Sequence, residues 1–240
     1  MEDEKKSSVA YGGGFLRKLR PRHVATVIAN ELRMRFSSLI IPRLAIAQKK
    51  FLLWGVPTDY FLHRYNTTWR NERAVEMAAV SAFLAENQHG SLLEFGHVIR
   101  HYDIGHPDVI VDLYEKGDRV TNIDIVDFAT STKFDLIVSI STIEHVGWDE
   151  WPRSETKTRD ALERLTSFLG PNGKLFITAP TGHNPYLDDI IRQGIPNTLR
   201  QVFYVREGFE WSPQDNFTSL PYGSKGPGAA TLWIAEIGPN

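Results

Sequence analysis

The 240-residue sequence contains no cysteine, and this absence removes several kinds of chemistry at once. Disulfides, thiolate nucleophiles and cysteine-ligated metal centres are all excluded. No apolar run approaches the roughly 18 residues of a membrane-spanning helix, and the polar start Met-Glu-Asp-Glu-Lys-Lys is unlike a signal peptide. These features fit a reducing compartment, and we expect a cytoplasmic protein.

The sequence also has little net charge, −2 over the whole chain, which does not favour a nucleic-acid-binding protein. The charge is unevenly placed, however. Residues 1–50 hold 11 Lys and Arg against 4 Asp and Glu, whereas the remainder holds 16 against 25. With 42% apolar and 23% charged residues, the composition predicts one globular domain with a basic extension.

The basic extension divides into two predicted parts. Residues 1–13 are polar and run into glycines, which predicts a mobile tail. Residues 14–65 predict a helical extension or cap, because apolar residues from Val24 to Phe36 recur at helical spacing beside a row of arginines. Two interpretations stay open. In the first, the helix meets an anionic substrate or an anionic membrane surface, and contact with a membrane would make the protein membrane-peripheral. In the second, the helix packs on the main domain with a solvated basic face.

Residues 66–240 alternate between short apolar runs and helical patterns, which is typical of an α/β domain. The runs are apolar at nearly every position and therefore indicate parallel strands covered on both faces. Two longer runs near the end, 201–211 and 229–237, predict an antiparallel pair. We expect the parallel strands within 91–96, 108–113, 120–123, 134–140 and 174–179, and helices over 71–86 and 156–169.

Two local features qualify this pattern. The helix over 71–86 has an apolar stripe through Val75, Ala79 and Phe83, and its charged residues Glu72, Arg73 and Glu76 lie on the other side. Only about six residues separate the second and third apolar runs, where a parallel crossover normally takes about a dozen. Either a loop replaces the linking helix there, or the third strand lies elsewhere.

Acidic residues stand near the ends of these runs. The first ends in Leu-Glu-Phe-Gly, with Glu94 and Gly96, and Asp112 follows 18 residues after Glu94. Asn-Ile-Asp-Ile contains Asp124 and Ile125, and the run from Phe134 continues through Ser141 to Glu-His-Val. Ligands of open α/β sheets bind outside the carboxyl ends of the strands, so these side chains are candidates for one site.

With the terminal antiparallel pair, these motifs make residues 71–240 resemble the class I S-adenosylmethionine-dependent methyltransferases. The resemblance implies a Rossmann-like, seven-stranded, mostly parallel sheet with S-adenosylmethionine as cofactor. It implies Gly96 beside the methionine part of the cofactor, with Glu94 near its ammonium group. It also implies Asp112 at the ribose hydroxyls, where one carboxylate can accept two hydrogen bonds. The remaining implied cofactor residues are Asp124 and Ile125 at the adenine and Ser141 at the exit of the fourth strand.

The sequence departs from that family in its first loop. His97, Val98 and Ile99 follow Gly96 where a Gly-x-Gly-x-Gly loop is usual. A nicotinamide-binding domain is disfavoured further, because Gly-x-Gly-x-x-Gly is absent. Glu115 competes with Asp112 for the ribose. The altered loop leaves open an alternative function, a non-catalytic module that docks to a partner or membrane surface.

Two histidines follow the fourth and fifth strands and are the candidate catalytic residues. Transfer of a methyl group to a hydroxyl requires a base, and a histidine of near-neutral pKa suits that role. His145 is the favoured base and His183 the second candidate. We therefore predict O-methylation of a small molecule or glycan.

His97, His101 and His106 resemble a metal cluster in their spacing. A helix carrying all three would have to continue past Gly105, and no acid partner is evident nearby in the sequence. We therefore predict no metal site.

Overall fold

The computed structural model describes residues 43–87 and 90–239. The predicted tail over 1–13 and most of the predicted basic extension lie outside these residues, and so does the amphipathic pattern from Val24 to Phe36. Among the described residues, no helix is long and apolar enough to cross a membrane.

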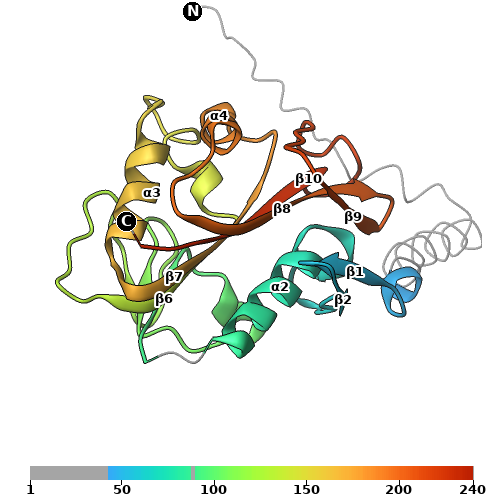
Figure 1. Ribbon diagram of the computed structural model, residues 1–240, viewed down its shortest axis with the longest axis horizontal. Coiled ribbons are helices and arrows are strands. Elements are labelled where there is room, and N and C mark those ends of the chain that lie inside the picture. Colours follow the sequence, from blue (N-terminus) through green and yellow to red (C-terminus); the bar gives the residue numbers. More distant parts are fainter. Residues whose placement is uncertain (1–42, 88–89, 240) are drawn as a thin grey trace, which may run out of the picture. The chain divides into compact units, whose positions relative to one another are not determined.

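The domain is built on an eight-stranded sheet with the order β5-β4-β3-β6-β7-β10-β8-β9 (Figure 1). Neighbours from β5 to β7 pair in parallel, and β10 runs antiparallel to both β7 and β8. This confirms the predicted α/β, Rossmann-like class with its antiparallel end. The strands are β3 (Leu92–Phe95), β4 (Val109–Val111), β5 (Val120–Thr121), β6 (Phe134–Ile140), β7 (Leu169–Pro180), β8 (Thr198–Glu207), β9 (Glu210–Gln214) and β10 (Thr231–Ile237).

The sheet has one strand more than the seven expected. The apolar run over 201–211 is not one strand, because the chain reverses at Gly208, whose φ of +64° suits a tight turn. β9 then pairs back on β8, with Glu207 opposite Glu210.

Helices cover the two faces of the sheet (Figure 1). Helix α2 (Arg73–Glu86) contributes Val75 and Phe83 to a core that includes Leu92 of β3. The next strand residue, Leu93, joins the opposite core, which contains residues of α3 (Lys157–Ser167) and α4 (Pro185–Gln193). Alternate residues of β3 thus enter different cores, as the two-residue period of a strand requires.

A loop replaces the linking helix between β4 and β5, which was one of the two alternatives for this short connection. Residues 112–119 contain no helix, and β5 pairs with β4 through Ile110 opposite Val120 and Val111 opposite Thr121. The third strand is therefore where the sequence placed it, but it is only two residues long.

The predicted boundary at residue 65 differs from the structure. Within the range predicted as a helical extension, β1 (Lys50–Leu53) and β2 (Val56–Asp59) form an antiparallel hairpin. Phe51 of this hairpin lies in the same core as α2, and the Tyr204 hydroxyl of β8 donates to the Leu52 carbonyl at 2.7 Å. The hairpin therefore belongs to the main domain, because its apolar side completes that core.

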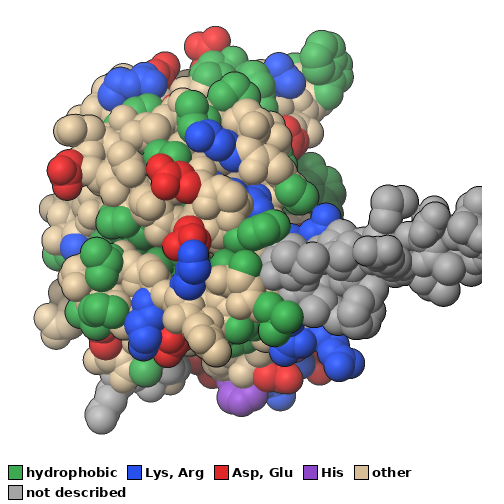
Figure 2. Space-filling model, turned by 90° about the vertical axis from the view of Figure 1, so that its right-hand side faces the viewer, with side chains coloured by type: hydrophobic (Ala, Val, Ile, Leu, Met, Phe, Trp, Pro, Cys, Tyr) green, Lys and Arg blue, Asp and Glu red, His purple; other side chains and the backbone are tan. Residues whose placement is uncertain are grey.

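Figure 2 shows one face of the molecule with its side chains coloured by chemical type. Hydrophobic, basic and acidic side chains are intermixed there, and no class forms a continuous patch on the described part of that face. This face thus offers no extended single-sign surface.

Candidate functional site

A pocket of about 420 Å³ opens beyond the carboxyl ends of the parallel strands. The sheet order reverses between β3 and its neighbours β4 and β6, so this is the switch point at which open α/β sheets bind ligands. Five predicted site residues line it together: Asp112, Asp124, Ile125, Ser141 and His145. Glu94, Gly96 and His183 are not among its lining residues.

Glu94 lies beneath the loop that follows β3. Its side chain is buried, and Oε1 accepts hydrogen bonds from the amides of Val98 at 2.6 Å and Ile99 at 2.7 Å. Oε2 is buried without a hydrogen-bond partner among the described residues. Glu94 therefore shapes the loop from below, and only its second oxygen is open to a further partner.

Burial raises the pKa of Glu94 to about 7, although the two backbone amides act in the opposite direction. The folded state thus holds this proton more tightly than the unfolded chain does. Its stabilising contribution is complete below about pH 4.5 and is lost as the pH rises through about 7.

We expect Glu94→Gln to flatten part of the pH dependence of stability. Between about pH 4.5 and pH 7 the wild type should lose about 3 kcal/mol of unfolding free energy that the variant retains. Urea unfolding at a series of pH values measures this, with the exposed Glu163→Gln as the matched control. Parallel pH profiles for wild type and Glu94→Gln would contradict the expectation.

Gly96 brings the loops after β3 and β6 into close approach. Its φ is +89°, and a Cβ atom added there would lie 2.2 Å from Oγ1 of Thr142. Its amide donates to the Val111 carbonyl of β4 at 2.9 Å. A side chain at this position would therefore collide with Thr142 in the loop after β6.

The two predicted cofactor aspartates already have protein partners. Oδ1 of Asp112 accepts from the amides of Tyr114 and Glu115 at 2.8 and 2.7 Å, which holds the turn after β4. Asp124 accepts from the Val126 amide at 3.1 Å and forms an ion pair with Lys157. Both carboxylates are thereby fixed in orientation at the pocket wall.

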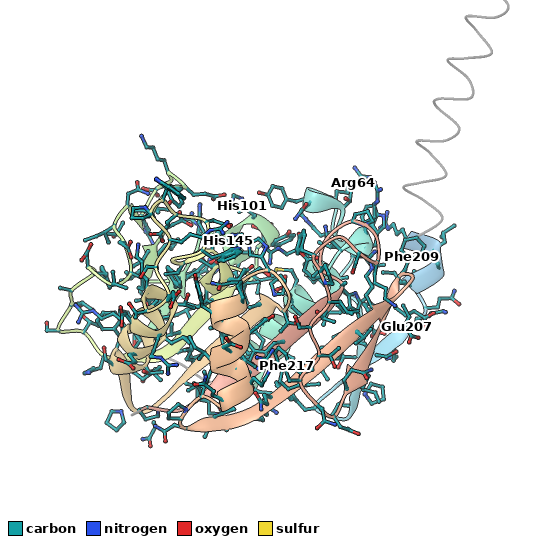
Figure 3. All side chains as sticks on the ribbon, turned by 90° about the horizontal axis from the view of Figure 1, so that it is seen from above. Arg64, His101, His145, Glu207, Phe209 and Phe217 are labelled. Atoms are coloured by element: carbon teal, nitrogen blue, oxygen red, sulfur yellow. The ribbon has the colours of Figure 1, made fainter. Side chains whose placement is uncertain are left out.

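His145 and His183 meet at one carboxylate, Asp149. Oδ2 of Asp149 lies 2.6 Å from Nδ1 of His145 and 3.1 Å from Nε2 of His183, and the two rings are 5.1 Å apart. Of these three residues, His145 is labelled in Figure 3. Partial burial raises the pKa of Asp149, but the hydrogen bonds and charges of the two histidines outweigh it and lower that pKa.

A buried charged group behind the pocket was missed from the sequence. Arg73 lines the pocket and pairs with Glu76, whose other oxygen accepts from the hydroxyls of Ser141 and Thr178. Glu144 is also buried, and burial raises its pKa well above the ordinary range. Arg73 stands in the first turn of α2, and this turn therefore reaches the pocket.

One sequence feature could have indicated this buried group. It is the acid-Arg-x-x-acid spacing of Glu72, Arg73 and Glu76 at the start of the predicted helix.

Two groups in the described part of the chain bring three metal-ligating side chains together. In each group, the ligand atoms lie within 4.8 Å of one another. In the first group Glu115 supplies an acid that the local sequence did not indicate, and the exposed His106 is not a member. The groups are His97, His101 and Glu115, and His145, Asp149 and His183.

These features define a Rossmann-like domain with a pocket at its switch point, lined by both acidic and apolar side chains. No protein-family profile and no curated protein sequence matches the chain. Among solved structures, the chain is similar to the N-methyltransferase NodS from Bradyrhizobium japonicum in complex with S-adenosylhomocysteine, at 15% identity and a TM-score of 0.46, over 69% of this chain and 85% of that one.

Two further solved structures show similar likeness. A TehB-like S-adenosylmethionine-dependent methyltransferase from Corynebacterium glutamicum is 20% identical with a TM-score of 0.41, over 67% of this chain and 86% of that one. The 1,6-didemethyltoxoflavin-N1-methyltransferase from Burkholderia thailandensis is 15% identical with a TM-score of 0.41, over 68% of this chain and 78% of that one.

Proposed function

We propose that this chain is an S-adenosylmethionine-dependent methyltransferase that methylates an oxygen of a small molecule or glycan. One observation carries the proposal. Two carboxylates from successive strand ends, Asp112 and Asp124, line the same pocket as His145, at the switch point of the sheet. Two carboxylates that could accept from a nucleoside and a histidine that could act as a base thus line one cavity.

The residues present fit the cofactor in their chemistry. Asp112 would accept from the ribose hydroxyls, and Asp124 from the adenine amino group beside the apolar Ile125. Arg73 is the cation at the wall and would bind the carboxylate of the methionine part. Ser141 lines the same pocket, and its hydroxyl donates to Glu76, the partner of Arg73. The unpartnered Oε2 of Glu94 is the remaining acceptor close to the switch point.

When bound, S-adenosylmethionine supplies an electrophilic methyl group. The protein then has to align the acceptor and remove its proton. With Nδ1 of His145 donating to Asp149, Nε2 would be the basic nitrogen of that ring, and it lies 3.6 Å from Oε1 of Glu144. His145 can therefore take the proton of an acceptor hydroxyl at Nε2, and Asp149 stabilises the charged ring. A neutral amine would not need this base, which is why we favour oxygen as the acceptor atom.

The proposal is tested by calorimetric titration with S-adenosylmethionine and S-adenosylhomocysteine. Saturable binding of both at micromolar concentration is expected. Absence of heat with either ligand at millimolar concentration would remove the enzyme proposal.

A non-catalytic module is the second candidate, and one observation favours it. Oε1 of Glu94 already accepts hydrogen bonds from the loop amides, and Asp124 already forms an ion pair with Lys157. Such a site could keep its shape without binding a cofactor. The same titration separates the two candidates, because a module of this kind would bind neither ligand.

Asp112→Asn should weaken S-adenosylhomocysteine binding by about 1–2 kcal/mol, or roughly 5- to 30-fold. Asparagine keeps the Oδ1 acceptor for the Tyr114 and Glu115 amides but loses the charge offered to the ribose. Asp118→Asn is the matched control, because Asp118 is exposed and lies in the same loop between β4 and β5. Unchanged affinity in the folded variant would reject the ribose role, and an equal loss in Glu115→Gln would favour Glu115 instead.

Residues 14–42 of the predicted basic extension lie outside the described residues, and their contact with an anionic surface stays a prediction. Co-sedimentation of the full chain with vesicles containing anionic lipid tests it, with neutral vesicles as the control. Binding to anionic vesicles that salt abolishes is expected if the segment docks electrostatically.

A further inference from the structure

The group formed by His97, His101 and Glu115 joins the two loops that flank the pocket. His97 follows Gly96 directly, and His101 lies in the short helix η3 (Ile99–Tyr102). Glu115 belongs to the loop between β4 and β5. His97 Nδ1 and His101 Nε2 lie 3.2 and 3.3 Å from the same carboxylate oxygen, Oε2 of Glu115.

We propose that His97, His101 and Glu115 bind a divalent transition-metal ion, with zinc the best fit. Two imidazole nitrogens and one carboxylate form an established zinc ligand set. Ligand atoms about 2.0–2.1 Å from a tetrahedral ion stand about 3.3 Å from one another. The two nitrogen-to-oxygen distances agree with this spacing, and all three ligand atoms lie within 4.8 Å of one another. Binding the ion therefore requires the rings to close on it.

The surroundings support a prepared site. His97 Nδ1 is buried, and the His97 side chain is 11% exposed. This nitrogen lies 3.2 Å from Oε2 of Glu115 but makes no hydrogen bond among the described residues. A metal ion held between the two atoms would satisfy both of them. Tyr65 stacks on the ring of His101 at 4.8 Å, which fixes its orientation. Glu115 is half-exposed, so water can complete the coordination.

The second histidine group fits a metal less well. Nδ1 of His145 lies only 2.6 Å from Oδ2 of Asp149. This is the length of a charge-assisted hydrogen bond and is shorter than the separation of two ligands on one ion. The His145 group therefore holds a proton, whereas the His97 group has the wider spacing of a metal site.

The position of the ion suggests its role. The loop after β3 lacks the glycines that would let it wrap a ligand, and the loop after β4 has no helix to hold it. Arg100 already bridges these loops by donating to the Asp118 carbonyl at 3.1 Å. A metal on His97 and Glu115, both of which line the pocket, would fasten the two loops at its rim. Any effect on cofactor affinity rests on the proposed function, whereas the metal site itself does not.

The test uses the full chain, stripped of metal by a chelator, with no cofactor added. Zinc titrated in a calorimeter should bind at one equivalent, and cobalt should give the visible absorption of a tetrahedral site. His101→Ala and Glu115→Gln should each weaken zinc binding more than about tenfold. Both side chains are partly exposed, and circular dichroism checks that the variants fold.

His106→Ala is the matched control, because this histidine lies five residues from His101 but outside the group. It should bind zinc like the wild type. Absence of zinc binding in the wild type would overturn the proposal, as would unchanged affinity in His101→Ala. Loss of binding in His183→Ala with retention in His101→Ala would assign the metal to the other group and also overturn it.

A second titration separates this inference from the proposed function. S-adenosylhomocysteine is added to the chain with and without one equivalent of zinc. Tighter binding with zinc supports the fastening role. Zinc binding in the first experiment with no S-adenosylhomocysteine binding in the second would leave the metal site standing and remove the methyltransferase.

Discussion

Replacing His145 by asparagine should lower the rate of methyl transfer by about 10²- to 10⁴-fold and leave cofactor affinity close to that of the wild type. The amide nitrogen of asparagine can take the place of Nδ1 and donate to Asp149, so the loop after β6 keeps its bond. The variant lacks a basic Nε2, and the proton of the acceptor hydroxyl has no receiver. The effect should therefore fall on the chemical step.

The measurement is single-turnover conversion of S-adenosylmethionine to S-adenosylhomocysteine, using an acceptor selected from hydroxylated small molecules and glycans. His183→Asn is the matched control, because His183 binds the same Asp149 but does not line the pocket. A larger loss in His183→Asn than in His145→Asn would exchange their roles. A normal rate in both variants would show that alignment alone suffices.

Asp149→Asn offers an independent view of the same group. Asparagine would present an amide that can donate to His145, which favours the wrong tautomer of that ring. We expect a loss similar to that of His145→Asn, and the double variant should lose little more, because the two residues act as a unit.

The largest expected effect on stability is that of Gly96→Ala. The added Cβ would meet Thr142 Oγ1 at 2.2 Å, and the residue would also be held at a φ of +89°. Backbone strain at a positive φ costs about 1–3 kcal/mol, and overpacking adds about 1–3 kcal/mol. We expect a loss of roughly 3–5 kcal/mol of unfolding free energy, measured by urea denaturation.

Gly194→Ala separates the two contributions. Gly194 has the same φ of +89°, but nothing lies within 4 Å of its added Cβ. This variant should therefore show the backbone cost alone. Combining Gly96→Ala with Thr142→Ala should restore part of the loss by removing Oγ1. Equal destabilisation by Gly96→Ala and Gly194→Ala would contradict the close approach at the switch point.

The order of elements along the domain was predictable because each depends on short-range pattern. Fully apolar runs such as 134–140 indicate strands buried on both faces, and β6 lies there. The stripe of Val75, Ala79 and Phe83 has helical period, and α2 covers it. The hairpin over 50–59 was not found, because its two strands are four residues each and only one side is apolar.

Part of the site could also be anticipated. Acids at strand ends are visible in sequence, and the carboxyl ends of parallel strands lie on one edge. Asp112, Asp124 and His145 therefore share a pocket as expected. Glu94 was expected beside them. Its side chain instead lies under the loop that follows β3, where the amides of Val98 and Ile99 donate to its carboxylate.

The sequence by itself determined the alternation of strands and helices and the strand ends that carry acids, because periodicity and burial act over a few residues. Only the tertiary structure decided which loops meet. It brought Asp149 between His145 and His183, and Glu115 to His97, across separations that no local spacing encodes. The order of strands in the sheet sets those encounters, and that order follows from the packing of the whole domain.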